Sequence, residues 1–175
     1  MAKKNIVLGV TGSIAAYRAA DLIRRFQDEG ADVTVVMTKE SCEFITPLTL
    51  ATLSGKEVYT DMFAKSNWKM GHIELSKADA LVIAPATANV IGKLANGLAD
   101  DFLTTLAITT KAKIFIAPAM NEDMYKNAIV TENCAKLKKY GFKFIEPIKG
   151  KLACGIVGAG HLAEVEDIVK VVLKV

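Results

Sequence analysis

The feature that most constrains the fold is a short apolar run that stops at a proline. Residues 113–125 read KIFIAPAMNEDMY, an apolar stretch typical of a buried parallel strand followed by Pro118 and a small-residue turn. Because proline fixes its own φ and donates no ladder hydrogen bond, we expect the chain to leave the sheet there. Ala119, Met120 and Asn121 then stand at the carboxyl end of a strand, which is the edge of an open parallel sheet where ligands bind.

Three further apolar runs end in similar small or polar loops. They are residues 6–10 before Thr11-Gly12-Ser13, residues 33–37 before Thr38-Lys39, and residues 80–84 before Pro85-Ala86-Thr87-Ala88-Asn89. The carboxyl ends of parallel strands meet at one edge of their sheet. Four strand ends are therefore predicted to converge on one crevice.

Helical patterns alternate with these strands, which predicts the α/β class. Ser13 is the expected N-cap of a helix over residues 14–29 that ends at Gly30, with a buried face made of Ile14, Tyr17, Ala20, Leu22, Ile23 and Phe26. Thr46-Pro47 predicts the start of a short helix closed by Gly55. The remaining expectations are an edge strand and loop in 56–71, a helical stretch over 90–110 broken near Gly97, a helix over 131–140, a strand over 142–145, and a last helix beginning near 164–167.

The segment 148–162 has a different character. It carries Gly150, Gly155, Gly158 and Gly160 without any helical or strand period. Such a glycine-rich segment is more typical of a mobile flap than of a core element.

Composition excludes several classes of protein. A chain of 175 residues that is 51% hydrophobic predicts one domain, residues 1–175. A net charge of +3 with scattered lysines does not suggest nucleic acid, and three cysteines without paired spacing argue against both a disulfide framework and a metal site. The apolar runs are too short to cross a membrane and residues 1–5 lead straight into the first strand, so a soluble cytoplasmic protein is expected.

The loop after the first strand indicates which nucleotide could bind. Gly9-Val10-Thr11-Gly12-Ser13 lacks the third glycine of a dinucleotide fingerprint, and Thr38-Lys39 follows the second strand where an NAD site needs an acidic residue. A site for one phosphate remains, which suits a mononucleotide such as FMN. The alternative is that Gly12-Ser13 only makes a tight turn. Thr87 and Asn89 suit the edge of a neutral isoalloxazine ring, although Asn89 also fits an ordinary helix start.

Several motifs occur together and in a fixed order. They are Gly12-Ser13-Ile14-Ala15-Ala16-Tyr17, His72-Ile73-Glu74-Leu75, Pro85-Ala86-Thr87-Ala88-Asn89, Pro118-Ala119-Met120-Asn121-Glu122-Asp123-Met124-Tyr125 and Leu152-Ala153-Cys154-Gly155. Over nearly its whole length the chain resembles the flavin-containing cysteine decarboxylases, and most closely their coenzyme A branch. It departs from the family pattern at Tyr125, where tryptophan is usual.

The resemblance implies a flavodoxin-like fold, a single-domain doubly wound parallel sheet in three Rossmann-like layers. It implies FMN as the cofactor and homo-oligomers, either trimers with a flavin at each subunit boundary or dodecamers built of trimers. Most bacterial relatives are fused to a ligase, so the chain is expected to be either free-standing or the first domain of a fusion. The residues implied to hold FMN are Gly12, Ser13, Ile14, Thr38, Thr87, Ala88, Asn89 and Ala119.

The implied reaction is the decarboxylation of 4'-phosphopantothenoylcysteine to 4'-phosphopantetheine. Flavin would oxidise the substrate to a thioaldehyde, CO2 would leave, and the enethiolate would be reduced again, since loss of CO2 needs an electron sink. His72 is the expected base, Asn121 the donor to the substrate carboxylate, Cys154 the acid, and Met120 a further substrate contact. Each residue also has a purely structural alternative. His72 could be an ordinary surface or core histidine, Asn121 a turn asparagine, and Cys154 a small apolar residue that only packs.

Three rival functions remain open. A peptidyl-cysteine decarboxylase of the lantibiotic type would use the same fold, flavin, histidine and asparagine. A flavin prenyltransferase has a similar fold but no use for Asn121 and Cys154 together. A regulatory subunit without activity is disfavoured because His72, Asn121 and Cys154 are all present.

Overall fold

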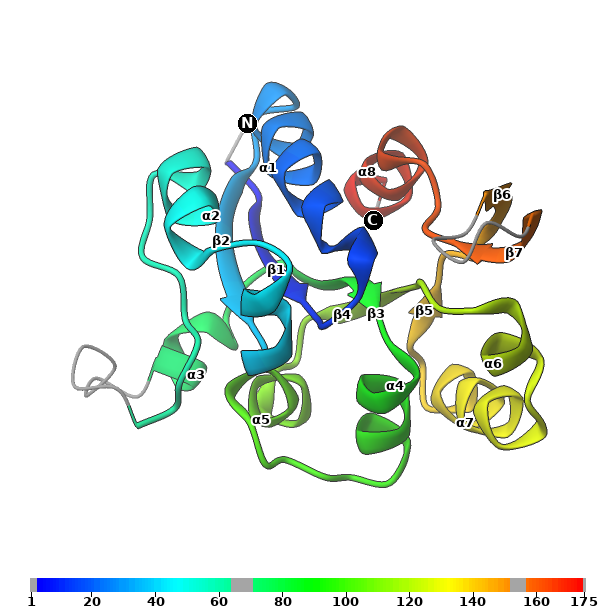
Figure 1. Ribbon diagram of the computed structural model, residues 1–175. Coiled ribbons are helices and arrows are strands. Elements are labelled where there is room, and N and C mark those ends of the chain that lie inside the picture. The colour runs from blue at the N-terminus through cyan, green and yellow to red at the C-terminus, as the bar shows by residue number, and fades with distance from the viewer. Residues whose placement is uncertain (1–2, 64–70, 152–156, 175) are drawn as a thin grey trace.

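The computed structural model describes residues 3–63, 71–151 and 157–174. Its central sheet is parallel, with the strand order β2-β1-β3-β4-β5 (Figure 1). The strands are β1 (Asn5–Val10), β2 (Asp32–Met37), β3 (Ala80–Ala86), β4 (Lys113–Pro118) and β5 (Lys143–Phe144). This order is that of flavodoxin-like doubly wound sheets, so the predicted fold class is confirmed.

Helices cover both faces of the sheet and complete three layers (Figure 1). On one face, α1 (Ala19–Asp28) and α8 (Val165–Leu173) contribute Leu22, Phe26 and Ile168 to a buried cluster. On the other face, α4 (Ala88–Ala95), α5 (Phe102–Thr109) and α7 (Ala128–Lys139) contribute Ile91, Leu103 and Leu137 to a second cluster. The remaining helical segments are η1 (Ile14–Arg18), η2 (Lys39–Glu43), α2 (Pro47–Ser54), α3 (Gly71–Leu75) and α6 (Glu122–Lys126).

The predicted helix caps are present. The Ser13 hydroxyl accepts the backbone N–H of Ala15, and the Thr46 hydroxyl accepts that of Thr49. Gly55 closes α2 in the left-handed conformation, with φ of 69°. These local signals are confirmed because each depends only on residues close in sequence.

The prediction of one regular helix over residues 14–29 with Ile14 and Tyr17 buried was wrong. The segment begins as the 3-10 helix η1, and α1 starts only at Ala19. In a 3-10 helix residues three apart lie on the same side, so Ile14 and Tyr17 share one side, and they are 57% and 53% exposed. Ala16 occupies the buried side instead.

Other element boundaries also differ from the predictions. The third strand continues through Pro85 to Ala86. The helical stretch predicted over 90–110 begins earlier, at Ala88, and its predicted break near Gly97 is confirmed, since α4 ends at Ala95 and Asp101 caps α5 in a capping box with Thr104. The helix predicted over 131–140 begins at Ala128, and the strand predicted over 142–145 spans two residues. In 56–71, Tyr59 forms an isolated parallel bridge to Val36, whereas residues 64–70 lie outside the described part.

The segment 148–162, predicted to be a flap rather than a core element, lies outside the central sheet, but it contains strands that its sequence pattern does not indicate. Strands β6 (Ile148–Lys151) and β7 (Val157–His161) pair as an antiparallel hairpin beyond the β5 side of the sheet (Figure 1). Cross-strand hydrogen bonding supplies the order that a local hydrophobic period does not indicate. Residues 152–156, which include Cys154, lie outside the described residues. None of the helices in the described ranges is long and apolar enough to cross a membrane.

Candidate functional site

A cavity of about 330 Å³ lies at the carboxyl ends of β1, β2, β3 and β4. In a sheet of this order the strand connections reverse direction between β1 and β3, which is the place where doubly wound folds bind ligands. The residues lining the cavity are Thr11, Gly12, Ser13, Thr38, Glu40, Thr87, Ala88, Asn89, Val90, Lys93, Asp101, Met120 and Met124. Sequence reasoning therefore located the cavity, since most residues predicted to hold the cofactor line it.

Thr11 joins the two strand ends on either side of this reversal. Its buried hydroxyl donates to the carbonyl of Pro85 at 2.7 Å and accepts the backbone N–H of Thr87 at 3.1 Å. Both hydrogen bonds cross from the end of β1 to the end of β3. The β1–β3 side of the cavity is thus fixed by hydrogen bonds between residues that are 74 and 76 positions apart in the sequence.

Gly12 permits a close approach between two cavity loops. A Cβ at this position would lie 2.5 Å from Cβ of Glu40 and 3.2 Å from the Glu40 backbone carbonyl carbon. Because the second neighbour is backbone, a side chain could be accommodated only by moving the start of η2. The absence of a side chain at Gly12 therefore sets the distance between the loops after β1 and β2.

The hydroxyl of Thr38 is a buried polar atom at the wall of the cavity. Thr38 is only 7% exposed and lines the cavity, and its Oγ1 has no hydrogen-bond partner among the described residues. Leaving a buried hydroxyl unpaired costs roughly 1–3 kcal/mol. The Thr38 backbone is satisfied, since its N–H donates to Val10 and its carbonyl accepts the Ser41 hydroxyl.

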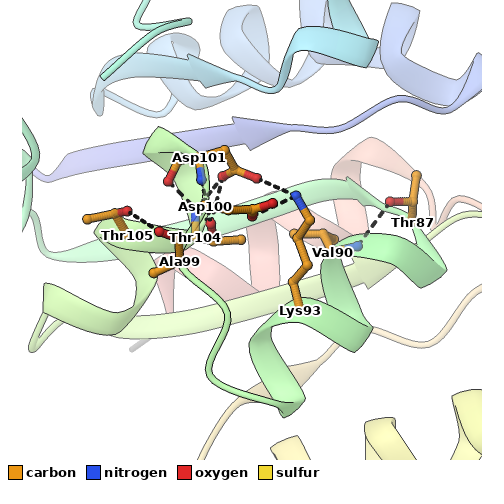
Figure 2. A network of polar contacts seen from close by, with 8 residues as sticks. All are labelled: Thr87, Val90, Lys93, Ala99, Asp100, Asp101, Thr104 and Thr105. Atoms are coloured by element: carbon orange, nitrogen blue, oxygen red, sulfur yellow. Dashed lines mark hydrogen bonds and ion pairs between the residues drawn. The ribbon is translucent and has the colours of Figure 1, made fainter. Parts of the chain in front are cut away.

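An ion-pair network forms the α4–α5 side of the cavity (Figure 2). The Lys93 ammonium lies 2.8 Å from Asp100 and 3.0 Å from Asp101, and Asp101 also caps α5. Partial burial lowers the pKa of Lys93, but the hydrogen bonds that its ammonium donates to both aspartates, together with their negative charges, raise it by more, so the pKa lies above its ordinary value. The lysine charge is thus neutralised within the protein.

Asn121 follows the cavity residue Met120 and caps α6. Its side-chain oxygen accepts the Asp123 backbone N–H at 2.8 Å, so its amide NH2 is the end left to donate elsewhere. Ala119, one residue before Met120, donates its N–H to Ala86 at 3.0 Å and ties the end of β4 to the end of β3. Ala119 and Asn121 adjoin the cavity in sequence but are not among the described residues that line it.

The remaining predicted residues are placed differently. His72 lies on α3, and its ring packs edge-on against the Phe102 ring with 6.4 Å between the ring centroids. His72 is not among the described residues that line the cavity of its own chain. Ile14 projects to solvent beside Ser13. Cys154 lies outside the described residues.

Sequence reasoning did not select Thr11, Glu40, Val90, Lys93 or Asp101 as cavity residues. Thr11 could have been found, because it directly follows a strand and precedes the glycine turn. Lys93 and Asp101 carried no such signal, since they are eight positions apart in the sequence and only the turn between α4 and α5 brings them together.

The two described cysteines do not have the features of a reactive thiol. Burial raises the pKa of Cys42, with Glu43 adding to the effect, and burial also raises the pKa of Cys134. A raised pKa keeps a thiol protonated at neutral pH. Within the described ranges no group of three or more His, Cys, Asp or Glu side chains could hold a metal ion.

The sheet order and the cavity define a class of protein. A cavity at the β1/β3 reversal, with an unpaired hydroxyl, uncharged donors and a neutralised lysine, fits one mononucleotide with a single phosphate and an uncharged ring. The chain is an α/β protein with a mononucleotide-type site.

Comparison with known proteins gives the family. The Flavoprotein family model matches residues 1–175, so the chain belongs to this family, as its motifs had predicted. The chain is 49% identical over 173 residues to the coenzyme A biosynthesis bifunctional protein CoaBC of Bacillus subtilis, covering 98% of this chain and 43% of that protein. It thus spans less than half the length of such bifunctional relatives. It is 44% identical over 171 residues to a probable phosphopantothenoylcysteine decarboxylase of Streptococcus mutans, covering 95% of this chain and 96% of the relative.

Two solved structures share the whole fold. One is a PPC decarboxylase with a cysteine-to-serine mutation, complexed with pantothenoylaminoethenethiol; it is 38% identical with a TM-score of 0.90, covering 99% of this chain and 98% of that one. The other is the FMN binding protein AtHal3, 39% identical with a TM-score of 0.86, covering 99% and 96%.

Proposed function

We propose that the chain is an FMN-dependent carboxy-lyase that converts 4'-phosphopantothenoylcysteine to 4'-phosphopantetheine in coenzyme A biosynthesis. The observation that carries the proposal is the match to the Streptococcus mutans relative, which extends over nearly all of both chains. The mononucleotide-type cavity supports it, because the Asn121 amide, whose donor end is unoccupied by its cap, adjoins that cavity. In this proposal residues 1–175 form one FMN-binding domain that acts in the cytoplasm.

The chain's own residues would hold the cofactor and handle protons. FMN would be held by Gly12, Ser13, Ile14, Thr38, Thr87, Ala88, Asn89 and Ala119, and when bound it supplies a reversible hydride acceptor for the carbon that bears the substrate sulfur. His72 would take the thiol proton. Asn121 would donate to the substrate carboxylate, beside Met120, without adding a charge that opposes loss of CO2. Cys154 would return a proton to carbon.

We also propose that the active form is a homo-oligomer, a trimer or a dodecamer of trimers, with each site at a subunit boundary. The position of His72 supports this, since His72 does not line the cavity of its own chain among the described residues. Exposed apolar side chains, Ile73 on the same helix and Phe44 and Leu48 after β2, are consistent with a covering subunit.

The test combines the visible spectrum of the purified protein, its mass in solution and its reaction products. The purified protein is expected to be yellow, to have a solution mass of at least three chains by light scattering, and to release CO2 from 4'-phosphopantothenoylcysteine. The Cys154→Ser variant is expected to release CO2 from the substrate but not to form 4'-phosphopantetheine. A yellow protein inert toward this substrate would instead favour the peptidyl-cysteine decarboxylase. A colourless protein that binds no added FMN would contradict the proposal.

The unpaired hydroxyl of Thr38 gives a second prediction. Thr38→Val should leave the cofactor-free protein equally or slightly more stable, because it removes a buried group without a partner. It should weaken FMN binding about ten-fold, the loss of about one hydrogen bond. Thermal melts of the cofactor-free protein and FMN titration measure the two effects, with the exposed Thr109→Val as control. Unchanged FMN affinity would show that the hydroxyl does not contact the cofactor.

A further inference from the structure

The hairpin β6–β7 is attached to the loop that carries the candidate site. The backbone N–H of Met120 donates to the carbonyl of Gly160 on β7 at 3.0 Å. A Cβ at Gly160 would lie 2.2 Å from the Met120 carbonyl oxygen, so no other residue allows this approach without a shift of backbone. The backbone of β7 is thus in direct contact with the residue that precedes Asn121.

Helix α6 adds a side-chain contact to the same strand. The Glu122 carboxylate accepts the Ala159 backbone N–H and pairs with Lys126 at 2.8 Å. The hydrogen bond from Lys126, followed by that from Ala159, lowers the pKa of Glu122, so the carboxylate stays ionised at neutral pH. A Cβ at Gly158 would lie 2.5 Å from Glu122 Oε2, which shows how closely the side chain lies against β7.

A second contact from α6 reaches the segment that leads into the hairpin. The Tyr125 hydroxyl donates to Glu146, which lies two residues before β6 begins. Glu146 is also bound by Lys138 of α7 at 2.7 Å. Glu122 therefore contacts β7, and Tyr125 contacts the residue that precedes β6 by two positions. Both contacts come from one short helix, and that helix starts at its cap, Asn121.

We propose that α6 is a clamp that fixes the β6–β7 hairpin relative to Asn121, with Glu122 and Tyr125 as its positioning residues. The consequence for catalysis depends on the proposed function. Asn121 would bind the substrate carboxylate, and Met120 beside it lines the cavity while its backbone is held by Gly160 of the hairpin. Loosening the clamp should then weaken substrate binding more than it slows the chemical step.

The test uses the FMN-loaded protein and four variants. Glu122→Ala removes the acceptor for the Ala159 N–H, Glu122→Gln keeps an oxygen acceptor, and Tyr125→Phe removes only the hydroxyl. Glu132→Ala deletes an exposed carboxylate of the neighbouring helix α7 and is the matched control. Hydrogen exchange of the Ala159 and Met120 amides reports the clamp directly, while KM and kcat for 4'-phosphopantothenoylcysteine report its effect on the reaction.

Glu122→Ala is expected to speed exchange at both amides by about ten-fold and to raise KM by a similar factor, with kcat changed less than three-fold. Glu122→Gln should restore most of the protection, Tyr125→Phe should raise KM by a smaller factor, and Glu132→Ala should match the wild type. Unchanged exchange in Glu122→Ala would refute the clamp. Faster exchange without a change in KM would refute its role in substrate binding. If the wild type itself does not act on this substrate, the proposed function fails, and the exchange data still decide whether the clamp exists.

Discussion

Asn121→Asp is expected to lower kcat/KM for 4'-phosphopantothenoylcysteine roughly 100- to 1,000-fold while leaving the protein folded and yellow. Aspartate is as good an N-cap as asparagine, so the hydrogen bond from the Asp123 N–H that starts α6 should survive. What disappears is the amide NH2, and a second negative charge takes its place opposite the substrate carboxylate. Steady-state kinetics beside the visible spectrum of each protein measure the effect.

Asn127→Asp is the matched control for this prediction. Asn127 caps α7 through the same geometry, its side-chain oxygen accepting the Ile129 N–H at 3.0 Å. The same substitution there changes charge and cap chemistry equally but should leave activity within about two-fold, since an exposed surface charge contributes little. If Asn121→Asp retained more than a tenth of the wild-type kcat/KM, the amide would not be the carboxylate donor.

Gly12→Ala is expected to weaken FMN binding about 100-fold. The added methyl would lie 2.5 Å from the Glu40 Cβ and 3.2 Å from its backbone, so the loops after β1 and β2 must separate. Ser13 and Thr38, one on each loop, would then no longer face a single ligand at the right spacing. Overpacking of this kind should also cost about 1–3 kcal/mol of stability. Fluorescence titration with FMN and thermal melts measure the two quantities.

Gly92→Ala is the control for the glycine substitution. Gly92 lies within α4, the helix that carries the cavity residues Ala88, Asn89 and Lys93, yet an added Cβ would meet only the Asn133 amide at 3.8 Å. Alanine is favoured over glycine inside a helix by up to about 1 kcal/mol, so this variant should bind FMN normally and melt at an equal or higher temperature. Normal FMN affinity in Gly12→Ala would mean that the loop spacing does not govern cofactor binding.

The two substitutions test different properties of one site. Gly12 sets the distance between the two loops that would hold the cofactor, whereas Asn121 contributes a single functional group that would contact the substrate. Cofactor affinity should respond to the first and turnover to the second. The site is also connected to the hairpin, because Met120 lines the cavity and its backbone N–H donates to the carbonyl of Gly160 on β7.

Local chemistry was enough to predict much of this protein. Apolar runs broken by Pro118, by Gly12-Ser13 and by the loop at Thr87 predicted parallel strands whose ends converge, and the structure confirms a flavodoxin-like order. Ser13 and Thr46 were identified as caps because a cap is decided by residues within four positions. The flavoprotein family followed from several short motifs in a fixed order and is confirmed by the family match.

Tertiary structure decided what depends on distant residues. Ile14 and Tyr17 look like core residues in a helical pattern, but the tighter turn of η1 exposes them. Lys93 meets Asp100 and Asp101 only because α4 and α5 pack around a turn (Figure 2). The glycine-rich segment 148–162 shows no hydrophobic period in the sequence, because its strands are held by pairing between β6 and β7 and by the contact of Glu122 with β7. A period in the sequence records which side of an element is buried, whereas cross-strand hydrogen bonds and ion pairs join residues whose separation along the chain is arbitrary, and these contacts exist only in the folded state.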